Sequence, residues 1–209
     1  MGFCLFNNVA VGAAHALARG IERVLVIDWD VHHGNGTQEI FYSDRRVLYV
    51  SSHAYPFYPG TGAASEMGEG DGRGFTVNLP LPSGCGDPEY AAVYRDVVEP
   101  IGRAFAPEIV LVSVGFDPHA LDPLAGMNVT EAGFGALTRS CLSVANSARG
   151  AVFVLEGGYA LPAIAASTAE VVRQIVGEGE ADEIESTTAG ERLAADYRRF
   201  LSPLWPDLG

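Results

Sequence analysis

Four long runs of aliphatic and β-branched residues constrain the fold of this chain most strongly. They are "RVLVID" (23–28), "VLYVSS" (47–52), "EIVLVSVG" (108–115) and "AVFVLEGG" (151–158). Each run is continuous rather than alternating, which is typical of a strand buried on both faces, as in a parallel sheet covered by helices. The stretch "GFTVNLPL" (74–81) indicates a fifth strand or an extended segment.

Helical patterns fill the intervals between these runs. They cover residues 8–19, 36–43, 87–105, 130–148, 161–176 and 188–201. We expect Gly20 to cap the first helix at its C-terminus, and Asp87 to cap the third at its N-terminus ahead of Pro88. Pro100 should kink or break that third helix. The order of elements predicts an α/β fold, a doubly wound and mostly parallel sheet with helices on both faces.

Composition narrows the class of protein and its setting. A length of 209 residues that are 48% hydrophobic suits a single domain, 1–209, with a sizeable core. The net charge of −13 argues against a protein that grips nucleic acid through its phosphates. It is compatible with a cationic substrate, although most proteins of this charge are acidic only to stay in solution. The scattered cysteines, Cys4, Cys85 and Cys141, favour a reducing, cytoplasmic setting, and no run suits a leader or a membrane span.

Residues that can bind a metal follow the first strand run directly. In an extended chain Asp28, Asp30 and His32 would point to one side, and a divalent cation would relieve the repulsion between the carboxylates. A third ligand should come from another strand end, where Asp117 and Asp122 are the available carboxylates. Asp28 would then orient a ligand or bind a second, harder cation. The alternative is structural: the aspartates cap the following helix and His32 forms a local hydrogen bond.

Two further features point to a site at the ends of the strands. Tyr159 follows two glycines, where its hydroxyl could donate a hydrogen bond to a developing oxyanion or could simply pack on the sheet. Residues 53–73, "HAYPFYPGTGAASEMGEGDGR", form a loop that is longer than a simple connection requires. Long ordered loops in compact domains often carry function.

Several of these segments together resemble the zinc-dependent histone deacetylase family. The segments are "GFCLFNNVAVGAA", "DWDVHHGNGTQEIFY", "FYPGTG", "GFDPHALDPLAGMNVT" and "LEGGYAL", in this order. The resemblance is nearest to the class II and bacterial branch, which includes acetylpolyamine amidohydrolases, and Asn35 is one mark of it. It implies an arginase-like α/β fold and the removal of an acetyl or acyl group from an amine.

The resemblance also implies roles for individual residues. Asp30, His32 and Asp122 match the three zinc ligands, which selects Asp122 over Asp117. Tyr159 matches the tyrosine that stabilises the transition state, while zinc polarises the amide carbonyl and activates water. Gly2, Phe3 and Tyr58 correspond to the wall of the tunnel that holds the acyl-lysine stem. Asp28 and Ser51 are similar to part of a structural potassium site, and carbonyls near Phe41, Asp44, Val47 and Phe75 are similar to a second one.

One family motif does not occur in this sequence. The family's general base and acid come from a His-His pair in a "GHH" motif just upstream of "GFC", whereas this sequence starts at Met1-Gly2-Phe3. We therefore expect a partial deacetylase domain that holds zinc but hydrolyses slowly. We also expect an exposed sheet edge that favours homo-oligomers or the binding of an N-terminal segment. His33 follows a zinc-ligand position and is not expected to replace this pair, His53 and His119 match no catalytic position, and His15 should pack in its helix.

The identity of the substrate and of the metal stays open at this stage. Acetylated lysine, an acetylated polyamine and a small acetylated amine are all compatible with the motifs, and zinc or ferrous iron could be bound. A non-catalytic module that binds metal and acylated ligands is the alternative function. An arginase-like manganese hydrolase is less favoured, because a binuclear site needs more bridging carboxylates.

Overall fold

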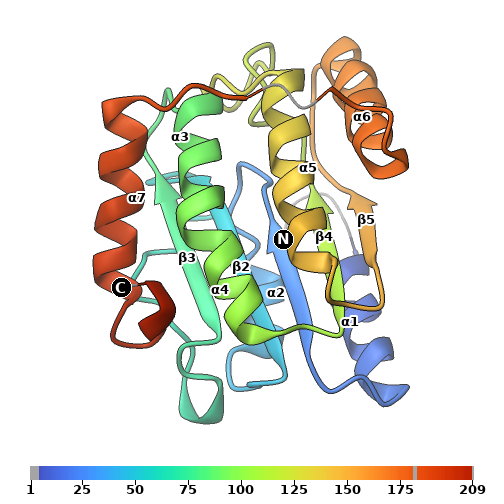
Figure 1. Ribbon diagram of the computed structural model, residues 1–209, viewed down its shortest axis with the longest axis vertical. Helices are drawn as coiled ribbons and strands as arrows, with labels where there is room; N and C mark the ends of the chain where they lie inside the picture. Colours follow the sequence, from blue (N-terminus) through green and yellow to red (C-terminus); the bar gives the residue numbers. More distant parts are fainter. Residues whose placement is uncertain (1–4, 181–182, 209) are drawn as a thin grey trace. The chain divides into compact units, whose positions relative to one another are not determined.

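The chain divides into two compact units, each of which is continuous in space but not in sequence. The computed structural model describes residues 5–180 and 183–208 (Figure 1). The first unit comprises residues 1–82, 105–115 and 145–156, and the second comprises residues 83–104, 116–144 and 157–209. The first unit contains the whole sheet, and the second contains most of the helices and the loop after β4.

The first unit is built on a five-stranded parallel sheet with the order β3-β2-β1-β4-β5 (Figure 1). Its strands are β1 (Val24–Asp28), β2 (Val47–Ala54), β3 (Thr76–Leu81), β4 (Ile109–Val114) and β5 (Ala151–Leu155). All four neighbouring pairs are parallel. The strands expected from the sequence are confirmed, and the undecided stretch "GFTVNLPL" forms β3.

Two helices of the first unit flank the sheet. α1 (Asn8–Ala18) contacts β1 and β4, and α2 (Asn35–Phe41) contacts β2. The Asn7 side chain caps α1 by accepting the N–H of Ala10 at 2.8 Å. The C-cap is Arg19, and Gly20 follows it with a φ of +90°, so the glycine lies one position later than expected. The core between α1, α2 and the strands consists of Val9, Ala10, Ala13, Ala16, Val24, Val26, Phe41, Val47, Tyr49 and Leu111.

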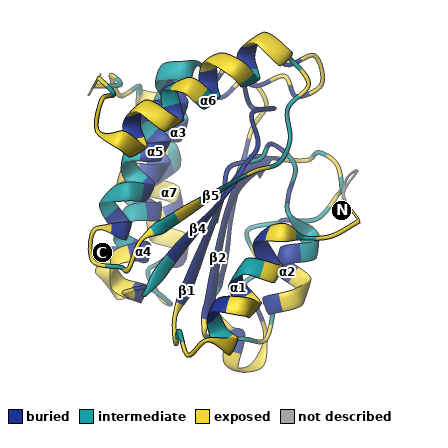
Figure 2. Cartoon of the chain, turned by 90° about the vertical axis from the view of Figure 1, so that its right-hand side faces the viewer, coloured by how far each residue is buried: buried dark blue, intermediate teal, exposed yellow. Residues whose placement is uncertain are grey.

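Burial differs sharply between the central and the edge strands. β1 and β2 are buried along their whole length, whereas Val152 and Leu155 in β5 are 47% and 59% exposed (Figure 2). The expectation that the run 151–158 is buried on both faces is therefore wrong. β5 pairs only with β4 in the sheet and ends at Leu155. Among the described residues it forms an apolar edge, a feature that often pairs with further polypeptide.

The second unit contains the helices α3 (Asp87–Val93), α4 (Glu99–Phe105), α5 (Glu131–Ala145), α6 (Leu161–Val176) and α7 (Thr188–Leu201). A π-helical segment, Tyr94–Val98, joins α3 to α4, so the helix is perturbed next to Pro100 but does not break there. Because Pro100 has no N–H for the Asp96 carbonyl, the helix changes its hydrogen-bond register just before it. A short 3-10 helix (η3, Pro206–Leu208) follows α7.

The helix cap expected at Asp87 is also different. Gly86 is the N-cap of α3, while the Asp87 carboxylate accepts the N–H and the hydroxyl of Thr130 at 2.7 and 2.6 Å. Asp87 therefore holds the start of α5 rather than the start of its own helix. Such a long-range contact of a side chain with another helix is not visible in a local sequence pattern.

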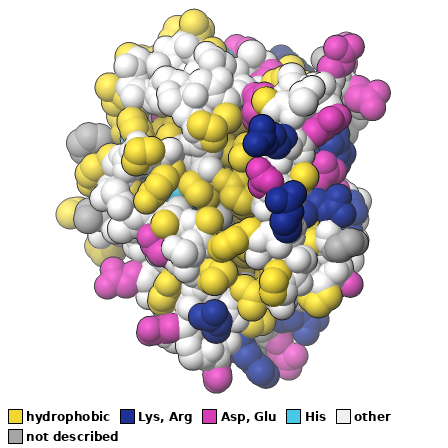
Figure 3. Space-filling model, turned by 90° about the vertical axis from the view of Figure 1, so that its left-hand side faces the viewer, with side chains coloured by type: hydrophobic (Ala, Val, Ile, Leu, Met, Phe, Trp, Pro, Cys, Tyr) yellow, Lys and Arg dark blue, Asp and Glu magenta, His cyan; other side chains and the backbone are white. Residues whose placement is uncertain are grey.

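On the face drawn in Figure 3, neither positive nor negative side chains predominate. There, Lys and Arg side chains lie beside Asp and Glu side chains, with apolar side chains between them. Of the helices in the described residues, none is long and apolar enough to cross a membrane.

The environment of two cysteines generates a prediction about reactivity. Cys85 and Cys141 are buried; burial and the nearby Glu89 raise the pKa of Cys85 to about 11, and burial and Glu99 raise that of Cys141 further. A thiol with a pKa of about 11 is only about 0.1% thiolate at pH 8, and the thiolate is the reactive form. In a Cys4→Ser variant, iodoacetamide at pH 8 should therefore leave the native protein unmodified, as measured by mass spectrometry.

The same protein unfolded in urea is the control, because both thiols should then react at the rate of free cysteine. The rate for the native protein should rise as the pH approaches 11. Rapid modification of either cysteine at pH 8 under native conditions would contradict their burial.

Candidate functional site

The end of β1 forms two consecutive turns that are closed by aspartate side chains. Asp28 Oδ1 accepts the N–H of Asp30 at 3.1 Å, and Asp30 Oδ1 accepts the N–H of His32 at 2.8 Å. The expectation of an extended chain from Asp28 to His32 is therefore wrong, because β1 ends at Asp28. A short carboxylate readily takes over backbone N–H groups two residues on, which turns the chain out of the sheet.

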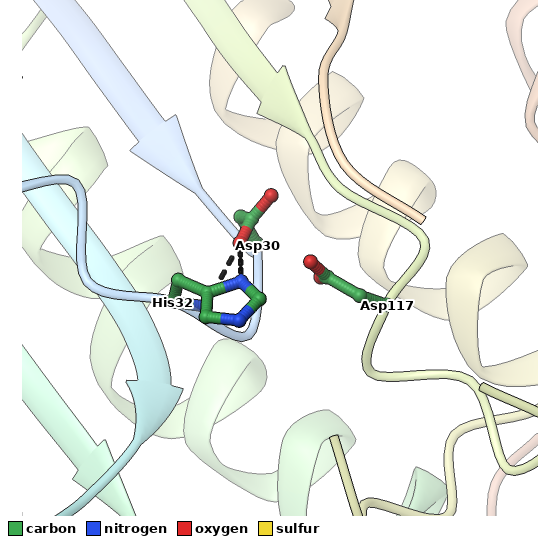
Figure 4. Close-up of side chains that lie close together, drawn as sticks. All are labelled: Asp30, His32 and Asp117. Carbon is green, nitrogen blue, oxygen red and sulfur yellow. Dashed lines mark hydrogen bonds and ion pairs between the residues drawn. The ribbon is translucent and has the colours of Figure 1, made fainter. Parts of the chain in front are cut away.

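This turn brings two of the expected zinc ligands into contact. Asp30 Oδ1 lies 3.0 Å from His32 Nδ1, and the dashed lines in Figure 4 mark the two contacts between these residues. Their side chains are 16% and 24% exposed, so both remain accessible to solvent. Figure 4 also draws Asp117, a third side chain of a type that binds metal ions, which belongs to the second unit.

The Asp30–His32 pair has the chemistry and the spacing that a divalent metal requires. Tetrahedral zinc with nitrogen and oxygen ligands separates neighbouring ligand atoms by about 3.4 Å, close to the observed contact. A Cβ at Gly115 would lie 2.3 Å from Asp30 Oδ2, so only glycine leaves room for this carboxylate. Burial raises the pKa of Glu156, and the negative charge of Asp30 adds to that shift. A carboxylate and an imidazole suit zinc and ferrous iron alike.

Aromatic side chains lie beside His32. The Phe57 ring stacks on the imidazole at a centroid distance of 5.2 Å, and the Tyr58 ring meets it edge-on at 6.1 Å. Tyr58 is 55% exposed, so it presents a face to solvent next to the candidate ligand. The tunnel wall expected at Tyr58 stays a prediction, and the other two expected tunnel residues, Gly2 and Phe3, lie outside the described residues.

The residues expected to hold potassium lie opposite each other in the sheet. Asp28 of β1 and Ser51 of β2 are register partners, and both are buried. Asp28 Oδ2 accepts the hydroxyl of Tyr49 at 3.0 Å, and a Cβ at Gly34 would lie 2.5 Å from the same oxygen. For the second expected site, the carbonyls of Phe41, Asp44 and Phe75 each accept a backbone N–H. Potassium binding at either place stays a prediction.

Asp122 and Tyr159 come together within the second unit. Asp122 Oδ2 accepts the N–H of Tyr159 at 2.8 Å, and Asp122 Oδ1 accepts the N–H of Leu124 at 3.0 Å. Gly158, with a φ of +133°, makes the turn that sets Tyr159 there, and Tyr159 is 39% exposed. The carboxylate expected to bind zinc thus fixes the backbone of the expected catalytic tyrosine.

A buried polar network around His33 was not foreseen from the sequence. His33 Nδ1 lies 2.8 Å from Thr61 Oγ1, and His33 Nε2 lies 3.0 Å from Gln38 Oε1. Gln38 in turn donates to Glu66 Oε2 at 2.6 Å. Burial would raise the pKa of Glu66, but hydrogen bonds from Gln38, Ala63 and Gly62 outweigh it and lower that pKa. The Gly-rich loop was the only sequence signal for this network. Its residues Thr61 and Glu66 contact His33 and Gln38, and each pair is 28 residues apart in the chain.

Of the four histidines other than His32, three are buried and one is exposed. Burial, together with the nearby His33, lowers the pKa of His53 to about 4, and burial lowers that of His33. His119 is buried and stacks on Phe134. His15 is exposed on α1, so the expectation that it packs is wrong.

Comparison with known proteins shows the family of this chain. The model of the histone deacetylase domain matches residues 1–175, so the chain belongs to the histone deacetylase family. Histone deacetylase 15 of Arabidopsis thaliana is 43% identical over 216 residues, covering 100% of this chain and 39% of the relative. A protein named probable deacetylase from Archaeoglobus fulgidus is 44% identical over 162 residues, covering 77% of this chain and 45% of the relative.

The fold is shown by a solved structure as well. The crystal structure of the HDA15 HD domain superposes with a TM-score of 0.90 at 43% identity, covering 100% of this chain and 58% of that one. The α/β fold of the deacetylases, as expected from the sequence, is thereby confirmed. The chain spans less than half of the two curated relatives and somewhat more than half of that solved domain.

The close approach at Gly115 generates a prediction about the metal site. In Gly115→Ala, the added Cβ would also meet the Asp30 backbone at 2.7 Å, so the Asp30 carboxylate must move away from His32. Affinity for Zn²⁺, measured by competition with a chromophoric chelator, should fall by about 10–100-fold, as when groups that orient ligands are lost.

Gly12→Ala is the matched control, because its Cβ would meet only Leu111 at 3.5 Å, an ordinary contact. It should leave Zn²⁺ affinity unchanged. Equal affinity in the Gly115→Ala variant and the wild type would show that Asp30 does not depend on this space.

Proposed function

We propose that this chain is the metal-binding portion of a zinc-dependent deacetylase that hydrolyses the amide of an acetylated amine. The observation that carries the proposal is the Asp30–His32 pair at 3.0 Å, with the rings of Phe57 and Tyr58 against His32. A metal position next to aromatic side chains suits an acyl group on an aliphatic stem, because the rings can contact the methylene groups.

The proposed ligands are Asp30, His32 and Asp122, with the last assigned by resemblance to the family. Zinc bound there would supply a Lewis acid for the amide carbonyl. Asp117 is the competing third ligand that the residues alone leave open. Asp28 and Ser51 are proposed to hold K⁺ behind the zinc ligands.

The other roles belong to side chains of this chain. Tyr58 and Phe57 would flank the acyl stem and exclude water from it. Tyr159 would donate a hydrogen bond from its hydroxyl to the oxyanion, with its backbone N–H held by Asp122 at 2.8 Å. Because the two ring nitrogens of His33 and of His53 are engaged in hydrogen bonds, neither histidine is proposed as the base.

Proton transfer is proposed to come from the family's His-His pair, which these 209 residues do not include. General acid–base catalysis contributes roughly 10²–10⁴-fold, so the chain alone should hydrolyse slowly. We propose an acetylated lysine as the substrate, with an acetylated polyamine or small acetylated amine as alternatives, in the cytoplasm and without nucleic acid or membrane as partners. Association with a further copy or with the rest of a deacetylase domain would cover the β5 edge.

Zinc stoichiometry tests the ligand assignment. We expect about one Zn²⁺ per chain by atomic emission, since three such ligands suffice for a mononuclear site. Asp30→Ala and Asp122→Ala should lower Zn²⁺ affinity at least about 100-fold, whereas Asp117→Ala should not. Asp96→Ala, which removes an ion pair with Arg95 on the helix between α3 and α4, is the control and should bind Zn²⁺ normally.

Acetate release tests the reaction itself. The zinc-loaded chain should release acetate slowly from an acetyl-lysine peptide, and Tyr159→Phe should be slower still while it binds Zn²⁺ equally well. Binding of the peptide without any release of acetate would instead support a non-catalytic module. Loss of zinc in Asp117→Ala but not in Asp122→Ala would overturn the choice of third ligand.

A further inference from the structure

Glu66 fastens the loop that carries the aromatic residues of the site. This loop, residues 55–69, joins β2 to a 3-10 helix (η1, Gly70–Gly72). Glu66 Oε1 accepts the backbone N–H groups of Gly62 at 3.0 Å and Ala63 at 3.1 Å. Its Oε2 accepts the Gln38 amide of α2 at 2.6 Å. One carboxylate therefore ties the loop both to itself and to the sheet-flanking helix.

Gly62 is the point at which the loop meets the core. Its carbonyl accepts a hydrogen bond from His53 Nε2 at 2.9 Å, while Glu66 holds its N–H. Its φ of +91° and a distance of 2.4 Å from a Cβ to His53 Nε2 exclude any side chain here. Beside it, Thr61 contacts His33 Nδ1 at 2.8 Å. Both the N–H and the carbonyl of Gly62 are thus held by side chains, the half-buried Glu66 and the buried His53.

The hydrogen-bond network has one consistent arrangement of protons. A carbonyl only accepts, so His53 carries its proton on Nε2 and accepts the Ser51 hydroxyl on Nδ1, at 2.8 Å. Gln38 Oε1 accepts from His33 Nε2 and from Asn78 Nδ2, which leaves its amide nitrogen to face Glu66. The network therefore requires an acceptor at position 66 and a donor at the facing atom of position 38.

The aromatic pair, Phe57 and Tyr58, lies a few residues before the anchored residues Thr61 and Gly62 in the loop. Gly60 N–H donates to the Phe57 carbonyl at 2.8 Å, which closes a turn between the pair and Thr61. Phe57 and Tyr58 then lie against His32, whereas the adjacent His33 contacts the anchor. His32 thus belongs to the candidate metal site, while its neighbour His33 contacts the fixed end of the loop.

We propose that Glu66 is a positioning residue that sets the affinity for the acylated amine by holding Phe57 and Tyr58 against His32. The inference deepens the proposed function and rests on it. Glu66 does not touch the ligand; it acts through Gly62, Ala63 and Gln38. Removing its charge should therefore weaken ligand binding while the zinc ligands stay in place.

The test uses a swap of the facing pair. Glu66→Gln places an amide donor against the Gln38 amide, and Gln38→Glu places two carboxylates at a 2.6 Å contact. The double variant Gln38→Glu/Glu66→Gln restores an acceptor facing a donor and keeps an oxygen for the N–H groups of Gly62 and Ala63. Glu69→Gln is the control, because the same charge is lost from an exposed residue of the same loop, whose carboxylate accepts the exposed Ser43 hydroxyl at 3.1 Å.

Three quantities are measured on the zinc-loaded full chain. They are the Kd for an acetyl-lysine peptide, the Zn²⁺ stoichiometry, and the amide hydrogen exchange of Gly62 and Ala63. Each single variant should raise the Kd about tenfold and accelerate both amides, with Zn²⁺ stoichiometry unchanged. The double variant should return both quantities to near the wild-type values, and the control should change neither. Where acetate is released, KM should rise with kcat retained.

Each contrary outcome has a distinct meaning. Wild type that binds Zn²⁺ but no acetylated peptide removes the proposed function and this inference with it. Wild type that binds the peptide, together with an unchanged Kd in Glu66→Gln, overturns the inference alone. Equal loss of Zn²⁺ and peptide in Glu66→Gln, or a double variant that restores amide exchange without restoring the Kd, also overturns it.

Discussion

The acceptance of backbone N–H groups by aspartate side chains at the end of β1 is the interaction on which the rest of the site depends. Asp28 receives the N–H of Asp30, and Asp30 receives that of His32. Because a carboxylate replaces the neighbouring strand as hydrogen-bond partner, the N–H groups of Asp30 and His32 stay paired where the chain leaves the sheet. The same contacts place the Asp30 and His32 side chains together, so one local turn both ends the strand and forms the pair proposed as metal ligands.

The surroundings of this turn explain the glycines that lie far from it in sequence. Gly34 leaves space for Asp28 and the Tyr49 hydroxyl, and Gly115 leaves space for Asp30. Neither Gly34 nor Gly115 has a positive φ, so conformational freedom is not the reason for glycine at these positions. The reason is the close approach of a carboxylate, which leaves no space for a Cβ. The end of a parallel strand can hold two negative side chains only where neighbouring segments leave this room.

The sequence was sufficient to predict the sheet but not its exposure or its helix contacts. The continuous apolar runs predict β1, β2, β4 and β5, because such runs are typical of strands in a parallel sheet. They do not predict that β5 is half exposed, since burial depends on what lies beside an edge strand. The role of Asp87 was also hidden, because its partner Thr130 is 43 residues away. Local patterns report the periodicity of an element, whereas caps and edges depend on distant segments.

For the candidate site, the residue types were predictable and the contacts were not. Asp30 and His32 follow a strand and were expected as ligands, but an extended chain was the wrong reason for their proximity. The choice between Asp117 and Asp122 could not be made from spacing, because both follow the same strand within a few residues. Asp122 now has a further physical connection, since its carboxylate holds the N–H of Tyr159.

The adjacent residues His32 and His33 show how a short segment divides two tasks. The Asp30 turn sets the partly exposed His32 side chain against the Asp30 carboxylate, while His33 is 3% exposed and contacts Thr61 and Gln38. A buried imidazole with both nitrogens engaged is costly to displace, so it fixes the backbone on which its neighbour stands. The loop that carries Phe57 and Tyr58 is attached to the same backbone. The candidate metal ligand and the aromatic wall are therefore positioned by one network, and a change in either part should be felt by the other.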